Sequence, residues 1–436
     1  MCYKRCEMQE PQKRLVRAIG RWSLVALTIN SVIGSGVFGL PSTTAKLLGP
    51  YSTFAVLIAA ALIAVIMACF AEVASHFTEA GGPYLYARTA FGRLVGLLVG
   101  WMLYLAQCAA PAANANLFVI YLGQFWPAAI HRPNQIAILT VLVGVLAVIN
   151  VLGVKQGANA SNILTIAKIL PLLMVILAGA AVTVVHPAPW GAVTPFTRGD
   201  WLKAMLLLIF AYGGFETALA PMSEAKDPRR DSVFALFAAL ISCTVIYGLI
   251  QWVVVGVLGP AATGDRPISD VARIAMGDRG STLVAIGALL SFYGYLSAKM
   301  LAMPRVTFAL AEAGDLPGWF ASVSRRFHTP WFSIGVFAVA VWGLAIKGNF
   351  QWNLTLSAIA RLFYYGVVCA ALIALRYKQV EPPKFRLPAG PALAVLGVTI
   401  CVALLTQVDR SQSRIVGVTV AAAVVNWIWV RKTSSQ

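Results

Sequence analysis

The chain has 436 residues, of which 59% are hydrophobic and only 11% are charged, and its mean hydropathy is +0.78. This composition excludes a soluble globular protein and requires many apolar segments of about 20 residues, the length that crosses a bilayer as a helix. A net charge of +18 would suggest nucleic-acid binding in a soluble protein. Here the Lys and Arg residues concentrate in alternate loops and in both tails. The positive-inside rule therefore accounts for the charge with both termini in the cytoplasm, and we expect no nucleic-acid partner.

The apolar segments predict an all-α integral membrane protein with twelve transmembrane helices in the cytoplasmic membrane. Their centres lie near residues 32, 62, 110, 142, 173, 213, 246, 296, 339, 365, 399 and 421. The largest connections, about 185–200, 260–280 and 312–330, are too short to form a core of their own. The seven cysteines show no paired spacing, so we expect free thiols.

The first predicted span contains Gly34-Ser35-Gly36 at its centre. Two glycines around a serine weaken a helix and let N–H and C=O groups leave the helical hydrogen-bond ladder. In the middle of a bilayer, freed backbone groups are tolerated where they line an enclosed cavity or contact a ligand. Close helix packing through small residues is the alternative interpretation.

A second interruption, Phe210-Ala211-Tyr212-Gly213-Gly214-Phe215-Glu216, lies in the sixth span. Two interrupted spans at corresponding positions of two halves are typical of secondary transporters, in which they form the binding site. The pairing predicts a cytoplasmic tail over 1–21, a first repeat over 22–190 (helices 1–5) and a second over 200–378 (helices 6–10). Helices 11 and 12 follow over 390–431, and a cytoplasmic tail covers 432–436. Helix N-termini suit a carboxylate and helix C-termini an ammonium, so two broken helices fit a zwitterion.

Ionisable side chains are also predicted within spans. They are Lys168 in helix 5, Glu216 in helix 6, Lys299 in helix 8 and Arg361 in helix 10. Such groups are costly in a bilayer and indicate a proton or ion path, a ligand contact or a charged partner. Lys168 stands too far from either end of its span to reach water easily. Glu72, near the cytoplasmic end of span 2, is expected to pair with a loop arginine.

Several motifs occur in order along the chain. They are residues 33–38 in span 1, 71–74 and 79–87 in and after span 2, 210–216 and 224–230 in span 6 and its exit, 305–317, and 357–362. Together they resemble the amino acid–polyamine–organocation (APC) transporters over nearly the whole length. The resemblance implies the five-plus-five inverted-repeat (LeuT-like) fold with two extra helices, alternating access, and amino acids or amines as substrates. Thr78 departs from the family pattern, which has proline at this position.

The resemblance also assigns residues to the substrate. It implies that the carboxylate meets Ser35 and Gly36, and that the ammonium meets carbonyls of Val32, Phe210 and Gly213. Phe210 occupies the position of an aromatic gate in related transporters, so gating is favoured for this residue, with core packing as the alternative. The candidate substrate-binding residues are Val32, Ile33, Gly34, Ser35, Gly36, Phe210, Ala211 and Gly213.

The resemblance places the Lys168 ammonium where sodium-coupled relatives hold a second sodium ion. It therefore implies sodium-independent transport, with Lys168 and Glu216 as candidates for proton coupling. A tether from Lys168 to the break in span 1, and a hydrogen bond from Glu216 to freed backbone, remain alternatives without titration. Lys299 falls where some relatives carry a substrate-contacting aromatic, so it is a candidate specificity residue, with helix packing as the alternative. Arg361 is interpreted as structural.

The function predicted is secondary active transport of an amino acid, coupled to protons, with exchange of amino acids or amines as the alternative. A nutrient sensor and an intramembrane enzyme are remote alternatives. The four histidines fall in loops or at span ends, and the sequence shows no intramembrane cluster with metal-ligand or acid–base spacing, so we expect no enzyme, metal or cofactor. The Ala-rich stretch around 107–116 favours neutral amino acids, whereas a substrate-facing Lys299 would favour acidic ones. The sequence gives no prediction of the oligomeric state.

Overall fold

The computed structural model describes residues 20–77, 81–153, 158–189, 196–218, 228–378 and 385–433. Every regular element within these ranges is a helix. The N-terminal tail as far as residue 19 with its two cysteines, Thr78, positions 79–80 of the motif after span 2, and the Glu224-to-Asp227 stretch lie outside the described residues.

Two of the predicted spans are interrupted. They correspond to α1 (Arg21–Val32) with α2 (Ser35–Leu48), and to α8 (Arg198–Tyr212) with α9 (Phe215–Ala218). The other predicted spans correspond to α3 (Ser52–Ser75), α5 (Arg93–Leu122), α6 (Arg132–Val151), α7 (Ala158–Val185), α10 (Pro228–Leu258), α11 (Pro267–Glu312), α12 (Trp331–Lys347), α13 (Phe350–Tyr377), α14 (Gly390–Leu405) and α15 (Arg410–Thr433). Shorter elements are α4 (Gly82–Phe91), η1 (Gly49–Tyr51), η2 (Pro127–Ile130), η4 (Gly259–Ala261) and η5 (Gly318–Ala321).

Among the described residues, eight helical segments are long and apolar enough to cross a membrane, and α12 and α14 are shorter apolar helices. Each of the twelve predicted centres falls in one of the helices above or in its break. The all-α membrane fold is therefore confirmed. The division of the chain into two inverted repeats stays a prediction.

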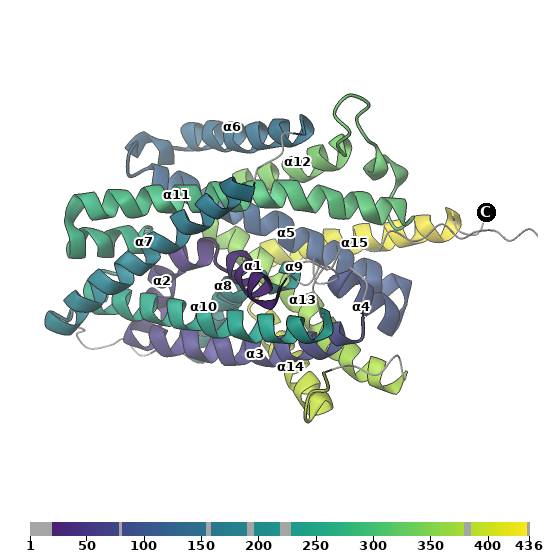
Figure 1. The fold of residues 1–436 in the computed structure, drawn as a ribbon, viewed down its shortest axis with the longest axis horizontal. Coiled ribbons are helices and arrows are strands. Elements are labelled where there is room, and N and C mark those ends of the chain that lie inside the picture. The colour runs from purple at the N-terminus through teal and green to yellow at the C-terminus, as the bar shows by residue number, and fades with distance from the viewer. Residues whose placement is uncertain are drawn as a thin grey trace, which may run out of the picture.

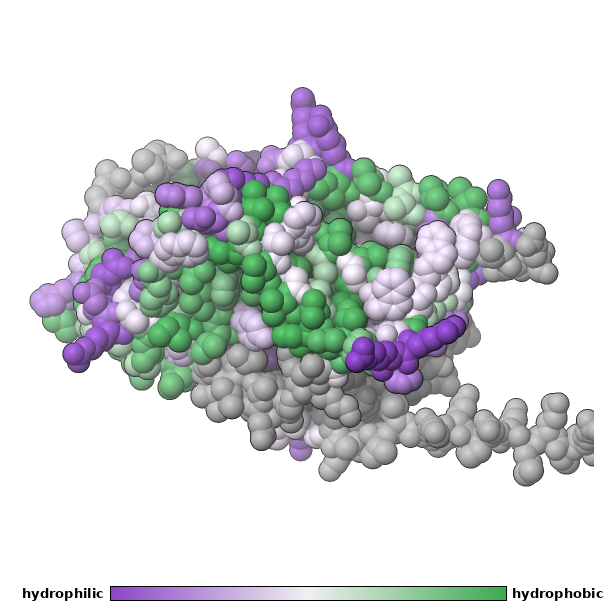
Figure 2. Space-filling model, turned by 90° about the horizontal axis from the view of Figure 1, so that it is seen from above, coloured by the Kyte–Doolittle hydropathy of each residue, from purple (hydrophilic) through white to green (hydrophobic). Residues whose placement is uncertain are grey.

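Most helices run along the long axis of the molecule, with α1 and α9 next to each other near its middle (Figure 1). Helix α6 packs against α12 at one edge of the bundle (Figure 1). A space-filling view of one face shows a broad hydrophobic area, with hydrophilic residues mainly toward its periphery (Figure 2). This distribution suits a protein whose sides face lipid and whose ends face water.

The structure differs from the sequence prediction in two places. Helix α11 begins at Pro267, although a loop was predicted over 260–280, and the chain bends at Gly277, where φ is 72°. Charged residues such as Asp270 and Arg273 lower the hydropathy of this segment, which hid the helix from a search for apolar spans. Helix α4, after span 2, was not predicted because it is only 10 residues long.

The cysteines and Glu72 follow the predictions where they are described. Cys69, Cys108, Cys243, Cys369 and Cys401 are buried free thiols. Arg376 forms a bidentate ion pair with Glu72: its Nε donates to Oε1 at 2.6 Å and its Nη2 donates to Oε2 at 2.7 Å. Arg376 lies in the last turn of α13, so this ion pair ties α3 to α13.

Candidate functional site

The first break separates α1 from α2 and places free carbonyl groups beside Lys168. The ammonium of this buried lysine, in α7, donates to the carbonyl oxygens of Asn30 at 3.0 Å and Ile33 at 2.7 Å. These carbonyls belong to the C-terminal end of α1, where backbone acceptors lack helical partners and the helix dipole favours a cation. Lys168, which belongs to a separate helix, therefore supplies hydrogen bonds to carbonyl groups that the break in span 1 leaves without helical partners.

A tyrosine on α10 links the two breaks. The Tyr247 hydroxyl lies 3.2 Å from the carbonyl oxygen of Val32 and 3.1 Å from that of Ala211, and it is buried. The Tyr247 hydroxyl thus contacts carbonyl groups at the C-terminal ends of both α1 and α8. The sequence analysis missed Tyr247, because a tyrosine within an apolar span carries no signal of which carbonyls it reaches.

Glu216 and Arg361 form a buried ion pair at the second break. Nη1 of Arg361 lies 3.3 Å from Oε1 of Glu216, and the two side chains are 2% and 0% exposed. The same carboxylate accepts hydrogen bonds from the Gly214 N–H at 2.9 Å, the Tyr364 hydroxyl at 2.8 Å and the Tyr365 hydroxyl at 3.0 Å. Glu216 is thus both charge-compensated and bonded to backbone at the break. The sequence analysis did not anticipate its pairing with Arg361.

Glycine is required where the broken helices meet their neighbours. A Cβ on Gly36 would lie 2.9 Å from the Cα of Ala211, so α2 packs directly on the backbone of α8. A Cβ on Gly213 would lie 1.6 Å from Nη1 of Arg361. Gly214 has a φ of +114°, and its Cβ would lie 2.3 Å from the Ser31 carbonyl oxygen. A side chain at any of these positions would displace backbone atoms or the ion pair. Glycine is therefore required there for steric reasons.

Phe210 contacts the arginine of the ion pair. It is 6% exposed, and the Arg361 guanidinium sits over its ring at 5.8 Å from the centroid. Ser35, at the start of α2, is fully buried, and its hydroxyl has no hydrogen-bond partner among the described residues.

A cavity of about 790 Å³ extends from the middle of the molecule toward α4 and the C-terminal end of α11. Three of the predicted charged residues, Lys168, Glu216 and Lys299, line it together with Asn30 and Ser31 at the end of α1. The remaining candidates are not among its described lining residues: Val32, Ile33, Gly34, Ser35, Gly36, Phe210, Ala211 and Gly213. All of them are buried, because α2 and α8 pack against each other at this point.

Lys299 projects from α11 toward α5. Its ammonium donates to Oε1 of Gln107 at 2.8 Å and lies 5.4 Å from the centroid of the Tyr295 ring. Only 8% of the residue is exposed. Lys299 is thus a buried cation in the cavity wall whose two direct contacts, Gln107 and Tyr295, are neutral, a description that sequence register alone did not provide.

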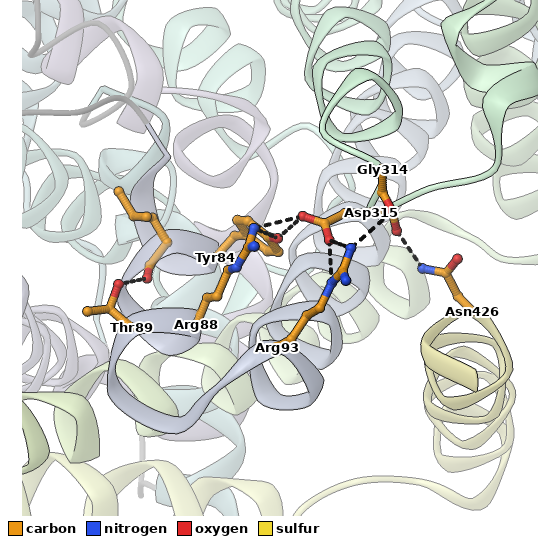
Figure 3. A network of polar contacts seen from close by, with 8 residues as sticks. Tyr84, Arg88, Thr89, Arg93, Gly314, Asp315 and Asn426 are labelled. Carbon is orange, nitrogen blue, oxygen red and sulfur yellow. Dashed lines mark hydrogen bonds and ion pairs between the residues drawn. The ribbon is translucent and has the colours of Figure 1, made fainter. Parts of the chain in front are cut away.

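Asp315, beyond the end of α11, holds together the end of the molecule toward which the cavity extends (Figure 3). Its fully buried carboxylate accepts hydrogen bonds from Tyr84, from Arg88 at 3.0 Å and from Arg93 at 2.9 Å. Asn426 of α15 donates to the Asp315 carbonyl oxygen at 2.9 Å. Burial and the neighbouring Asp315 carboxylate raise the pKa of Tyr84 to about 12, so its hydroxyl stays a donor at neutral pH.

The site has the features of a place that binds rather than transforms a small molecule. It offers backbone carbonyls at helix ends, ammonium groups and a neutralised carboxylate around one cavity. Within the described residues, His, Cys, Asp and Glu form no group of three or more that could hold a metal ion.

Comparison with known proteins gives the family. The model of a family described as "Amino acid permease" matches residues 19–429. The branched-chain amino acid permease BcaP of Bacillus subtilis (strain 168) is 28% identical over 420 residues, which cover 90% of this chain and 88% of that protein. From the same organism, a methylthioribose transporter is 28% identical over 90% of this chain and 88% of its own. The serine/threonine exchanger SteT is 27% identical over 90% of this chain and 91% of its own. The chain is a multi-pass membrane protein, a transporter and not an enzyme, and it belongs to the amino acid permease family of the APC superfamily.

Proposed function

We propose that this permease moves an amino acid across the cytoplasmic membrane by alternating access, without sodium and with coupling to protons. The observation that carries the proposal is the Lys168 ammonium on the carbonyls of Asn30 and Ile33. The fixed ammonium already occupies carbonyl oxygens that could otherwise coordinate a metal cation, which argues against sodium at this position.

The proposed substrate position is the junction of the two breaks. Its amino-acid backbone would contact the ends of α1, α2 and α8, from Val32 to Gly36 and from Phe210 to Gly213. The unpartnered Ser35 hydroxyl supports this assignment, because a buried donor gains by meeting a carboxylate. Since these residues are packed against one another and are not among the described lining of the cavity, binding there requires α1 or α8 to shift.

The proposed orientation places both termini in the cytoplasm. Arg88, Arg93 and Arg305 lie at the end toward which the cavity extends, and the positive-inside rule assigns such an end to the cytoplasm. In this orientation the cavity faces inward.

Exchange is the alternative mechanism, and one relative is an exchanger by name. Reconstituted proteoliposomes distinguish the two. We expect uptake driven by an inward proton gradient into vesicles free of internal amino acid, with equal rates in sodium and in choline at the same pH and ionic strength. Uptake that needs internal amino acid would establish exchange, and uptake that needs sodium would contradict the role proposed for Lys168.

Lys168→Ala tests coupling through this lysine. Removing the ammonium leaves the carbonyls of Asn30 and Ile33 without their buried donor and removes a titrating group. We expect uptake that no longer responds to a proton gradient, measured in the same proteoliposomes. The exposed Lys347, at the end of α12, provides the matched control as Lys347→Ala. If Lys168→Ala retains pH-dependent uptake, the lysine is a structural tether only.

A further inference from the structure

The cavity wall opposite the broken helices is rich in hydrogen-bond donors. Trp101 and Gln107 both belong to α5 and both line the cavity. The indole Nε1 of Trp101 and the amide Nε2 of Gln107 are buried and have no hydrogen-bond partner among the described residues. Buried donors without partners are rare because each costs free energy, and at a cavity they indicate a ligand that accepts from them.

Lys299 completes this wall from the facing helix α11. Its contact with Oε1 of Gln107 fixes the orientation of that amide, so Nε2 is the atom left without a partner. The other neighbour of the ammonium is the Tyr295 ring, which attracts a cation but does not neutralise it. The wall therefore presents one positive charge and two neutral donors.

The charges around the cavity are not balanced. Glu216 is the only acidic residue among the described lining residues, and Arg361 compensates it at 3.3 Å. Lys168 is occupied by the carbonyls of α1, and Arg305 lies exposed on α11 with its guanidinium on the carbonyl oxygen of Leu301. Glu216 attracts and Arg361 repels the Lys299 ammonium, and because these two residues are paired with each other, the described lining gives Lys299 no counter-charge of its own.

We propose that Lys299, Gln107 and Trp101 bind a carboxylate on the substrate's side chain, so that the permease selects acidic amino acids. This proposal rests on the transport function proposed above, in which the α-amino and α-carboxyl groups contact the broken helices. A carboxylate is planar and accepts several hydrogen bonds, which matches an ammonium and two N–H donors. It reverses the preference for neutral substrates expected from the Ala-rich stretch around 107–116 of α5.

The first test needs no variant. Binding of L-glutamate, L-aspartate, L-glutamine and L-leucine to the purified full-length protein is measured by thermal shift and by competition, since a ligand that binds the folded state raises its melting temperature. We expect glutamate or aspartate to bind roughly tenfold or more tightly than glutamine, the difference that a hydrogen-bonded charge supplies. Equal binding of glutamine and glutamate would overturn the proposal.

Lys299→Met tests the residue, with Lys299→Arg as the variant that keeps the charge and Lys347→Met as a matched control. We expect Lys299→Met to lose the preference for glutamate while still binding glutamine, and Lys299→Arg and Lys347→Met to keep the preference. If Lys299→Met weakens glutamate and glutamine equally, the lysine holds the α-carboxylate and the side-chain assignment is wrong. If a preference of the wild type for glutamate survives in Lys299→Met, the carboxylate is bound elsewhere.

The two proposals fail in different ways. A wild-type protein that binds and transports neutral amino acids but no acidic ones would overturn the proposed selectivity alone. A wild-type protein that transports no amino acid of any class would overturn the proposed function as well.

Discussion

Arg361→Met is expected to lower the free energy of unfolding by about 3–5 kcal/mol, the cost of leaving a buried charge without its partner. The side chain of Glu216 is fully buried, and Arg361 is its only cationic partner among the described ion pairs. Two tyrosine hydroxyls and one backbone N–H would remain on the carboxylate, but they carry no net positive charge. The substitution also removes the cation from the face of Phe210. Chemical denaturation of the detergent-solubilised protein measures the loss.

The double variant Arg361→Met with Glu216→Gln distinguishes charge from packing. Because the neutral amide needs no counter-charge, we expect the double variant to recover a large part of the stability lost in Arg361→Met. Arg325→Met, at an exposed arginine, is the control and should leave the stability nearly unchanged. A double variant no more stable than Arg361→Met would mean that the arginine acts through its packing against Gly213 and Phe210.

Gly36→Val is expected to abolish substrate binding and transport while the protein still reaches the membrane. The new Cβ would lie 2.9 Å from the Cα and 3.1 Å from the Cβ of Ala211, so α2 and α8 must separate at the junction of the two breaks. These contacts are with backbone and with a Cβ, which cannot rotate away as a long side chain can. Radiolabelled substrate binding to purified protein gives the result directly.

Gly343→Val is the matched control, because nothing lies within 4 Å of the Cβ position of Gly343 in α12. Gly36→Ala should produce an intermediate loss, since its single methyl group meets Ala211 but adds no branch. An unchanged affinity in Gly36→Val would show that neither the close packing nor the nearby backbone is needed for binding.

The sequence predicts those features that depend on local chemistry. Pairs of glycines in the middle of apolar spans, with a serine between them in the first break, locate both breaks, and a lysine in mid-span identifies Lys168 as a special residue. Contacts between distant segments need the rotation and depth of each helix, which composition and spacing do not fix. Arg361 was therefore recognised as structural without its partner Glu216, and the link through Tyr247 was not predicted.

The same limit applies to the cavity. Lys299 was a candidate by register, but whether it faced substrate or a neighbouring helix depended on how α11 is rotated. Of the donors on α5, Gln107 lies in the Ala-rich stretch that was interpreted as favouring neutral substrates, and Trp101 lies before that stretch. Asp315 belongs to a motif that carried the resemblance, yet its three donors come from segments far away in the chain.

The contacts of Asp315 limit which helices can move relative to one another during a transport cycle. Its contacts join α4 and α5, through Arg88 and Arg93, to the end of α11 and to α15 (Figure 3). Sliding these elements past one another would strip a buried carboxylate of its cations, at a cost of several kcal/mol. They are therefore expected to travel as a single rigid body. Helix α15, which lies outside both predicted repeats, is then expected to keep its position relative to α4, α5 and the end of α11 while the interrupted helices tilt.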